Sequence, residues 1–97
     1  MSYFVYILYS EKLNRFYIGK TSNLLQRLDH HNNPIQPEKF TARGIPWQLF
    51  LAIPCFSDKH SSALERLIKS KKSSVFIQNL KKYPELVERI VHQANQL

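Results

Sequence analysis

Two apolar segments separated by a polar one lie near the start of the chain, and this pattern predicts two strands. Residues 3–9 are rich in aromatic and β-branched side chains, and residues 16–18 repeat this character after the polar segment SEKLNR, so we expect a β-hairpin. Alternate residues of a strand share a face. One face of the first strand therefore holds Phe4, Tyr6 and Leu8, and the other holds Tyr3, Val5, Ile7 and Tyr9. Tyr17 points away from its two neighbours, Phe16 and Ile18.

The hydrophobic period then changes to that of a helix. Gly19 is expected to end the second strand, where a glycine permits a positive φ or the close approach of a ligand. Asn23, followed three residues later by Gln26, has the form of a helix N-cap close to a capping box. The helix should end before Pro34. Its expected buried stripe consists of Leu24, Leu25 and Leu28.

The rest of the chain predicts one more strand and more helices. Residues 33–46 hold three prolines and a glycine, which indicates a loop. We expect a third strand over residues 47–53, a helix that begins at Ser57 or Asp58, a short helix over residues 74–80, and a last helix from Pro84. The inward face of the second helix is expected to hold Leu64, Leu67 and Ile68. The order β-β-α-β-α plus C-terminal helices predicts an α+β fold, a small three-stranded antiparallel sheet flanked by helices.

Length and charge narrow the classes of function. Ninety-seven residues suit one domain, residues 1–97. Fourteen Lys and Arg residues against seven Asp and Glu residues give a net charge of +7, and residues 66–82 hold six of these cations without an acid. Such a balance favours a polyanionic partner, nucleic acid or an acidic membrane face. The alternative is an ordinary solvated helix face.

The predicted location is the cytoplasm. The apolar segment FVYILY is short and is followed by charged residues, unlike a signal peptide. No segment approaches the roughly 18 apolar residues that span a bilayer. The lone Cys55 cannot form an internal disulfide, which agrees with a reducing compartment.

Residues 15–32, RFYIGKTSNLLQRLDHHN, crowd chemistry-bearing side chains around one strand-to-helix turn. Arg27 and His31 are four residues apart and share a helix face, with His30 three residues from Arg27. A guanidinium suits a phosphate because it is always charged and donates two parallel hydrogen bonds. Further along the chain, Glu65 is a carboxylate of the kind that Mg²⁺ binds. The fold of the rest of the chain decides whether these side chains face one site.

The motifs resemble the GIY-YIG nuclease family, and most of all its small stand-alone members. The resemblance covers residues 3–72, with residues 74–97 as a helical extension, and rests on FVY at residues 4–6, YIG at residues 17–19, Arg27, His31 and Glu65. It implies an endonuclease that hydrolyses phosphodiester bonds in DNA, with Mg²⁺ (or Mn²⁺) as cofactor and a role in DNA repair or recombination. The implied catalytic residues are Tyr6, Tyr17, Arg27, His31 and Glu65, with Glu65 as metal ligand. The expected nucleic-acid-binding residues are Lys20, Arg27, His30, Thr41, Arg43, Lys69 and Lys72.

In this resemblance Tyr6 is a general base or positions the attacking water, Tyr17 lines the same pocket, and Arg27 holds the phosphate. A tyrosine has an ordinary pKa near 10, so a basic role requires a nearby cation or a metal-bound water, and Lys20 or His31 are candidates for the cation. Two departures stand out. Phe4 occupies the position of the first glycine in the family name, and the polar residue that often follows the glutamate has only Asn79 as a loose candidate.

Each side chain also has a structural explanation. Tyr6 and Tyr17 fit half-buried strand tyrosines, Arg27 and His31 fit exposed helix residues, and Glu65 fits the third-position partner of a capping box begun by Ser62. Two other functions therefore stay open. One is a nucleic-acid-binding module of the same fold without catalysis, and the other is an interaction domain that docks its last helix on a partner. The expected partner is nucleic acid, DNA above all, with no membrane, and the chain is a monomer or a weak homodimer.

Overall fold

The computed structural model describes residues 2–35 and 40–96 and has the predicted α+β architecture. The elements in chain order are β1 (Tyr3–Ser10), β2 (Arg15–Thr21), α1 (Leu24–Asn32), the 3₁₀ helix η1 (Phe40–Gly44), β3 (Trp47–Cys55), α2 (Asp58–Ser70), α3 (Ser74–Lys82) and α4 (Pro84–Asn95). The predicted loop over residues 33–46 therefore contains η1, while residues 36–39 lie outside the described residues. None of the helices in the described ranges combines the length and apolar character needed to cross a bilayer.

The three strands form one antiparallel sheet in the order β2-β1-β3. The central strand β1 pairs with β2 in a register that sets Tyr6 opposite Gly19, and with β3 in a register that sets Tyr6 opposite Ala52. Four consecutive residues of β1, 5–8, are buried, because helices cover both faces of the sheet. Tyr6 thus lies in the middle of the sheet.

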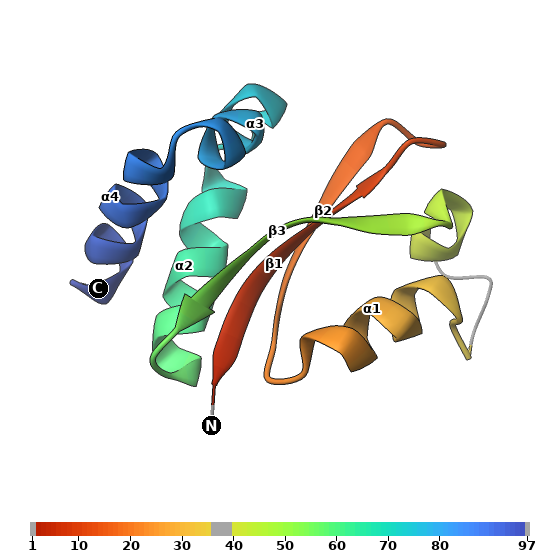
Figure 1. The fold of residues 1–97 in the computed structure, drawn as a ribbon, viewed down its shortest axis with the longest axis horizontal. Helices are drawn as coiled ribbons and strands as arrows, with labels where there is room; N and C mark the ends of the chain where they lie inside the picture. Colours follow the sequence, from red (N-terminus) through yellow and green to blue (C-terminus); the bar gives the residue numbers. More distant parts are fainter. Residues whose placement is uncertain (1, 36–39, 97) are drawn as a thin grey trace.

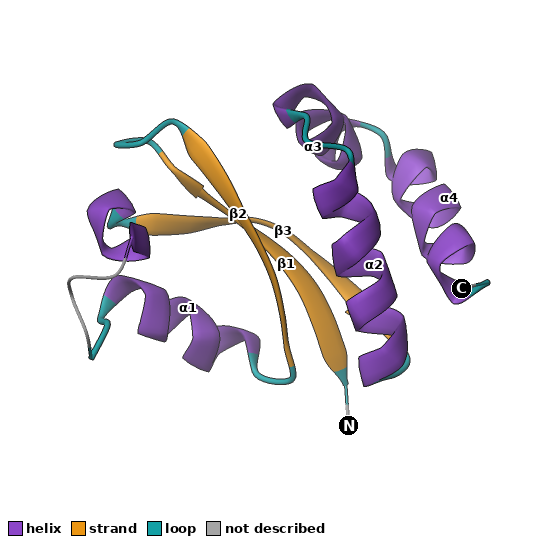
Figure 2. Cartoon of the chain, turned by 180° about the vertical axis from the view of Figure 1, so that it is seen from behind, coloured by secondary structure: helices purple, strands orange, loops and turns teal. Residues whose placement is uncertain are grey.

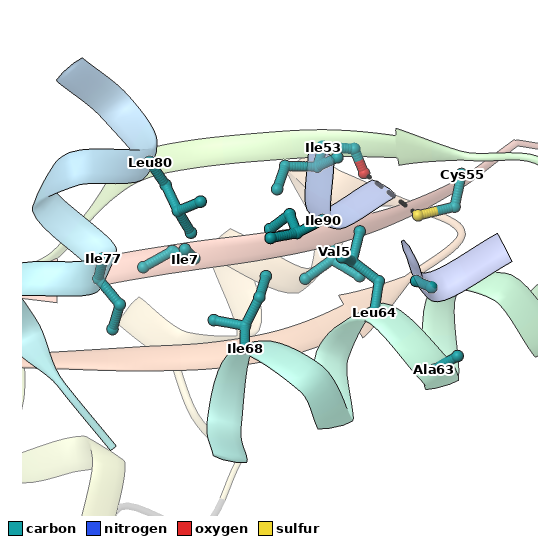
Figure 3. Packing of buried hydrophobic residues seen from close by; sticks show 11 residues of the cluster. Val5, Ile7, Ile53, Cys55, Ala63, Leu64, Ile68, Ile77, Leu80 and Ile90 are labelled. Atoms are coloured by element: carbon teal, nitrogen blue, oxygen red, sulfur yellow. Dashed lines mark hydrogen bonds between the residues drawn. The ribbon is translucent and has the colours of Figure 1, made fainter. Parts of the chain in front are cut away.

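The two faces of the sheet are covered unequally. Helices α2, α3 and α4 lie on one side and α1 on the other (Figures 1 and 2). The larger core lies on the first side, where Leu64 and Ile68 of α2 pack against Val5 and Ile7 (Figure 3). The smaller cluster, on the side of α1, has Tyr6, Leu8 and Trp47 at its centre. The predicted division of β1 into two faces is confirmed, since Val5 and Ile7 belong to one cluster and Tyr6 and Leu8 to the other.

Local side-chain caps fix where the helices begin. The Asn23 Oδ1 accepts a hydrogen bond from the backbone N–H of Gln26 at 3.1 Å, as the sequence predicts. Ser57 caps α2 in the same way by accepting from the backbone N–H of His60 at 3.1 Å. Because Ser57 is the N-cap, Ser62 lies inside the helix, and the interpretation of Glu65 as the capping-box partner of Ser62 is wrong.

Two further expectations are wrong for identifiable reasons. Gly19 does not end the second strand, which runs on to Thr21, and it has no positive φ. Leu25 is 81% exposed and does not belong to the buried stripe. Of the three leucines, Leu24 and Leu28 pack against the sheet and are half-buried, because the short helix touches its neighbours along a narrow line.

Candidate active site

The ring of Tyr6 lies directly over Gly19 of the neighbouring strand. A Cβ atom added to Gly19 would lie 2.5 Å from Cζ of Tyr6, well inside van der Waals contact. The close approach that a glycine permits is therefore used by a tyrosine of the same protein. Gly19 and Tyr6 are a matched pair, since only glycine leaves room for the phenol in this register.

Tyr6 and three other ring side chains form a cluster between the sheet and α1. Tyr17 lies beside Tyr6 with ring centroids 6.3 Å apart, and the His31 imidazole meets Tyr17 edge-on at 4.6 Å. The Tyr6 hydroxyl is 3.1 Å from His31 Nε2. The ring of Trp47 completes the cluster, with its centroid 6.1 Å from that of Tyr17 and 6.4 Å from that of His31. Strands β1, β2 and β3 and helix α1 each supply one ring.

The surroundings keep both partners of the Tyr6–His31 hydrogen bond neutral. Burial, and then the neighbouring Tyr17, raise the pKa of Tyr6 to about 12. Burial, and then the charges of Arg27 and His30, lower the pKa of His31. At neutral pH the phenol therefore donates to an unprotonated Nε2, which requires the imidazole proton to be on Nδ1.

Arg27 and Glu65 bring opposite charges to the same phenol from two helices. The Arg27 guanidinium, on the exposed face of α1, acts to lower the pKa of Tyr6, and the Glu65 carboxylate, on α2, acts to raise it. The side chain of Glu65 is 21% exposed and accepts an ion-paired hydrogen bond from Lys69 Nζ at 3.0 Å. Both charged groups are close enough to Tyr6 for their fields to reach it.

The Glu65 carboxylate is of the type that a hard divalent cation binds. A Mg²⁺ ion keeps most of its water ligands and needs only one or two carboxylates from the protein. Glu65 offers one carboxylate that is partly open to solvent, and its Lys69 partner is an exposed side chain one helical turn away. Within residues 2–35 and 40–96, no three His, Cys, Asp or Glu side chains gather to form a site made entirely of protein ligands. A cation bound here would therefore retain a large share of its waters.

A comparison with protein-family models gives a match to the GIY-YIG catalytic domain over residues 2–82. The chain belongs to the GIY-YIG family. A search of curated proteins and a search of solved structures both give no significant match. GIY-YIG domains are nuclease domains, generally dependent on a divalent metal, so the family supports a nucleic acid as substrate.

The other polar residues expected in the GIY-YIG site are spread around it. Lys20 lies on the opposite face of the sheet from Tyr6, where Nζ donates to Asp58 Oδ1 at 2.8 Å and to Ser62 Oγ at 2.5 Å. It is not among the groups that shift the pKa of Tyr6, whereas His31 touches the phenol directly. Lys20 instead ties β2 to α2, one turn before Glu65.

The remaining residues predicted to contact nucleic acid lie outside the ring cluster, at positions that we call the rim. His30 and Arg43 are exposed, on α1 and η1 respectively. Thr41 of η1 is half-buried, and its carbonyl accepts from the Trp47 indole N–H at 2.7 Å. Lys72 is exposed just beyond the C-terminal end of α2, about two turns from Glu65.

Sequence reasoning missed two residues that the structure places beside the candidate site, Trp47 and Asn32. Trp47 is 4% exposed and forms the wall against which Tyr17 and His31 pack. Its only signal in the sequence is a large aromatic side chain at the start of a predicted strand. Asn32 resembles any polar residue at a helix end, and its two bonds to Trp47 join positions 15 residues apart. No local pattern predicts such a contact.

Proposed function

We propose that this GIY-YIG domain is an endonuclease that hydrolyses phosphodiester bonds in DNA, with Mg²⁺ (or Mn²⁺) held by Glu65. The observation that carries the proposal is the neutral Tyr6–His31 pair, 3.1 Å apart, whose phenol lies within the fields of Arg27 and Glu65. A structural tyrosine needs one hydrogen-bond partner and nothing more. It does not need a cation and a carboxylate from two different helices.

Tyr6 and His31 act together as the general base. An isolated phenol with a pKa of about 12 is a weak proton acceptor at neutral pH, because it still carries its own proton. In the pair, the Tyr6 hydroxyl passes its proton to His31 Nε2 as its oxygen takes a proton from the attacking water. One proton enters the pair and one O–H bond is replaced by another, so the imidazole becomes cationic and the phenol remains neutral.

Arg27 and Glu65 complete the site. The Arg27 guanidinium binds the non-bridging oxygens of the scissile phosphate and offsets the negative charge that develops on them. Mg²⁺ bound at Glu65 supplies a Lewis acid for the phosphate and the departing oxygen. Tyr17 restricts the entry of bulk water and keeps His31 in contact with Tyr6, because its ring packs on both.

The expected substrate is DNA of a particular structure, without a strong sequence preference. The exposed cations at the rim, Arg43 and Lys72, and the imidazole of His30 suit phosphate contacts, which position a strand but do not distinguish bases. Lys69 can also turn to a phosphate when a metal replaces it at Glu65. Branched or single-stranded DNA of the kind formed in repair and recombination is the class of substrate that fits.

The test compares cleavage of plasmid, linear duplex, three-way junction and single-stranded DNA in Mg²⁺ and in EDTA. We expect Glu65→Gln to slow Mg²⁺-dependent cleavage by about 100-fold or more and to leave binding of DNA nearly unchanged. Arg27→Gln should slow cleavage and also weaken binding. Glu88→Gln is the matched control, because it makes the same chemical change at an exposed position on α4.

Two outcomes would contradict the proposal. If Glu65→Gln and Arg27→Gln cut as fast as the wild type, the cleavage comes from another source. If no substrate is cut, and binding falls steeply with salt but responds neither to Mg²⁺ nor to Tyr6→Phe, the domain is the binding module that the sequence left open.

A further inference from the structure

We propose that Asn32 is a positioning residue for the Tyr6–His31 pair, acting by tying the end of α1 to the backbone of Trp47. This inference rests on the function proposed above and adds a residue to its site. The Trp47 N–H donates to Asn32 Oδ1 at 2.6 Å, and Asn32 Nδ2 donates to the Trp47 carbonyl at 3.0 Å. One side chain thus satisfies both backbone groups of Trp47, as a neighbouring strand would.

The anchor point for Asn32 is held from three directions. Trp47 pairs with Ser10 of the central strand, its indole N–H donates to the Thr41 carbonyl at 2.7 Å, and it is 4% exposed. A residue fixed in this way can hold a helix end in place. The amide of Asn32 transmits that position to α1, whose last residue it is.

Helix α1 depends on this polar link because its apolar packing is slight. Within α1, all of whose residues the structure describes, no side chain is fully buried. Leu24 and Leu28 make its half-buried contacts with the sheet, and Leu25 is turned to solvent. The C-terminal turn, which carries His31, lies beyond Leu28, and the Asn32 amide bonds this turn to the backbone of β3.

The pair needs this precision because a hydrogen bond tolerates little displacement. The Tyr6 hydroxyl and His31 Nε2 are 3.1 Å apart, near the upper end of the favourable range, and the bond weakens steeply at longer distances. A shift of about 1 Å in the end of α1 would break it, and misplacement of that size costs up to about 100-fold in rate. His31 is the residue that directly precedes Asn32, so the two must move together.

The first test reads the position of His31 without any substrate. The ¹⁵N chemical shift of His31 Nε2, together with nuclear Overhauser contacts from His31 to Tyr17 and Trp47, is measured in the wild type, in Asn32→Ala and in Tyr6→Phe. Tyr6→Phe gives the reference signal for a lost hydrogen bond. We expect Asn32→Ala to shift Nε2 toward that reference and to weaken both ring contacts.

Asn33→Ala is the matched control. It removes a side-chain amide at the same helix end, one that bonds Asp29 of α1 and nothing on β3, and it should leave the His31 signals unchanged. The second test is kinetic, in which Asn32→Ala should lower kcat by about 10- to 100-fold with KM nearly constant.

A folded Asn32→Ala protein with wild-type His31 shifts and ring contacts overturns the inference, because Asn32 then serves stability alone. If Asn32→Ala does not fold, the same measurements on Asn32→Ser decide. Because the spectroscopic test needs no cleavage, it decides the role of Asn32 even if the wild type proves inactive on every substrate. Failure of the proposed function is recognised separately, by the absence of Mg²⁺-dependent cleavage in the wild type.

Discussion

Replacement of Gly19 by alanine tests the matched pair at the centre of the site. The new Cβ would lie 2.5 Å from Cζ of Tyr6, whereas carbon atoms in contact are about 3.5–4.0 Å apart, so the ring or the strand must move by about 1 Å. Tyr6 is 1% exposed and lies on the central strand, so its ring has little room to give way. Overpacking of this kind costs about 1–3 kcal/mol.

An opposing gain must be subtracted from that cost. Gly19 lies inside a strand with a negative φ, and alanine in such a position is favoured over glycine by about 0.5–1 kcal/mol through the unfolded chain. We therefore expect Gly19→Ala to lower the free energy of unfolding by about 0–2.5 kcal/mol. In a Tyr6→Leu background, which lacks the ring, the same substitution should be neutral or stabilising.

The assay is a double-mutant cycle from urea unfolding, followed by circular dichroism. A coupling energy of about 1–3 kcal/mol between Gly19 and Tyr6 is expected, and Gly19→Ala should also move the His31 Nε2 signal, since the phenol is displaced. Additive effects of the two substitutions, within about 0.5 kcal/mol, would refute the reasoning. The glycine at position 19 would then not be explained by the space that the ring of Tyr6 requires.

Three further predictions follow from burial and charge. Because burial raises the pKa of Tyr6 to about 12, the contribution of the Tyr6 phenol to stability is complete below pH 10 and is lost as pH rises through 12. The free energy of unfolding, measured in urea relative to Tyr6→Phe, should therefore fall by about 1.4 kcal/mol by about pH 11. Burial and then Arg27 lower the pKa of His31, so its contribution is complete above about pH 6.5 and is lost as pH falls through the lowered value. As the pH falls, the free energy of unfolding, measured relative to His31→Gln, and the rate of cleavage should decline together. A rate of cleavage that rises instead would contradict the role of the neutral His31 imidazole as a base. Leu25→Lys should change stability by less than about 0.5 kcal/mol, whereas Leu28→Lys should cost about 2 kcal/mol, compared by thermal unfolding, because Leu25 is 81% exposed and Leu28 packs on the Tyr6 cluster.

The parts of the fold that the sequence predicts well depend on short-range rules. The alternation in β1 separates Val5 and Ile7 from Tyr6 and Leu8, because the period of a strand is two whatever surrounds it. The cap at Asn23 needs only the next three residues of the chain. Of the candidate site, the cluster of Tyr6, Tyr17 and His31 was indicated by the motif resemblance, and the structure brings these three rings into contact.

The features that were not predicted depend on how elements meet. The three leucines near the start of α1 fit more than one rotation of the helix about its axis, and only contact with the sheet decides that Leu25 faces solvent. A glycine at position 19 suggests the end of a strand, yet β2 continues past it. The absence of a side chain at Gly19 leaves the space that the ring of Tyr6 occupies. Lys20, the next residue, points to the face of the sheet that α2 covers, and its Nζ donates a hydrogen bond to Asp58. A residue adjacent to the motif therefore helps to hold that helix against the sheet.

The two halves of the site are held by different forces. Glu65 lies on α2, whose Leu64 and Ile68 are buried in the main core. The position of Glu65 is therefore fixed by the packing of that core. Arg27 and His31 are carried by α1, which is held by half-buried leucines and by polar links at its two ends. Local stability follows buried apolar contact, so we expect local unfolding of α1 to cost less free energy than local unfolding of α2. The residues proposed to bind the phosphate and to accept the proton therefore lie on the less firmly packed side of the sheet, and the carboxylate proposed to bind the metal lies on the more firmly packed side.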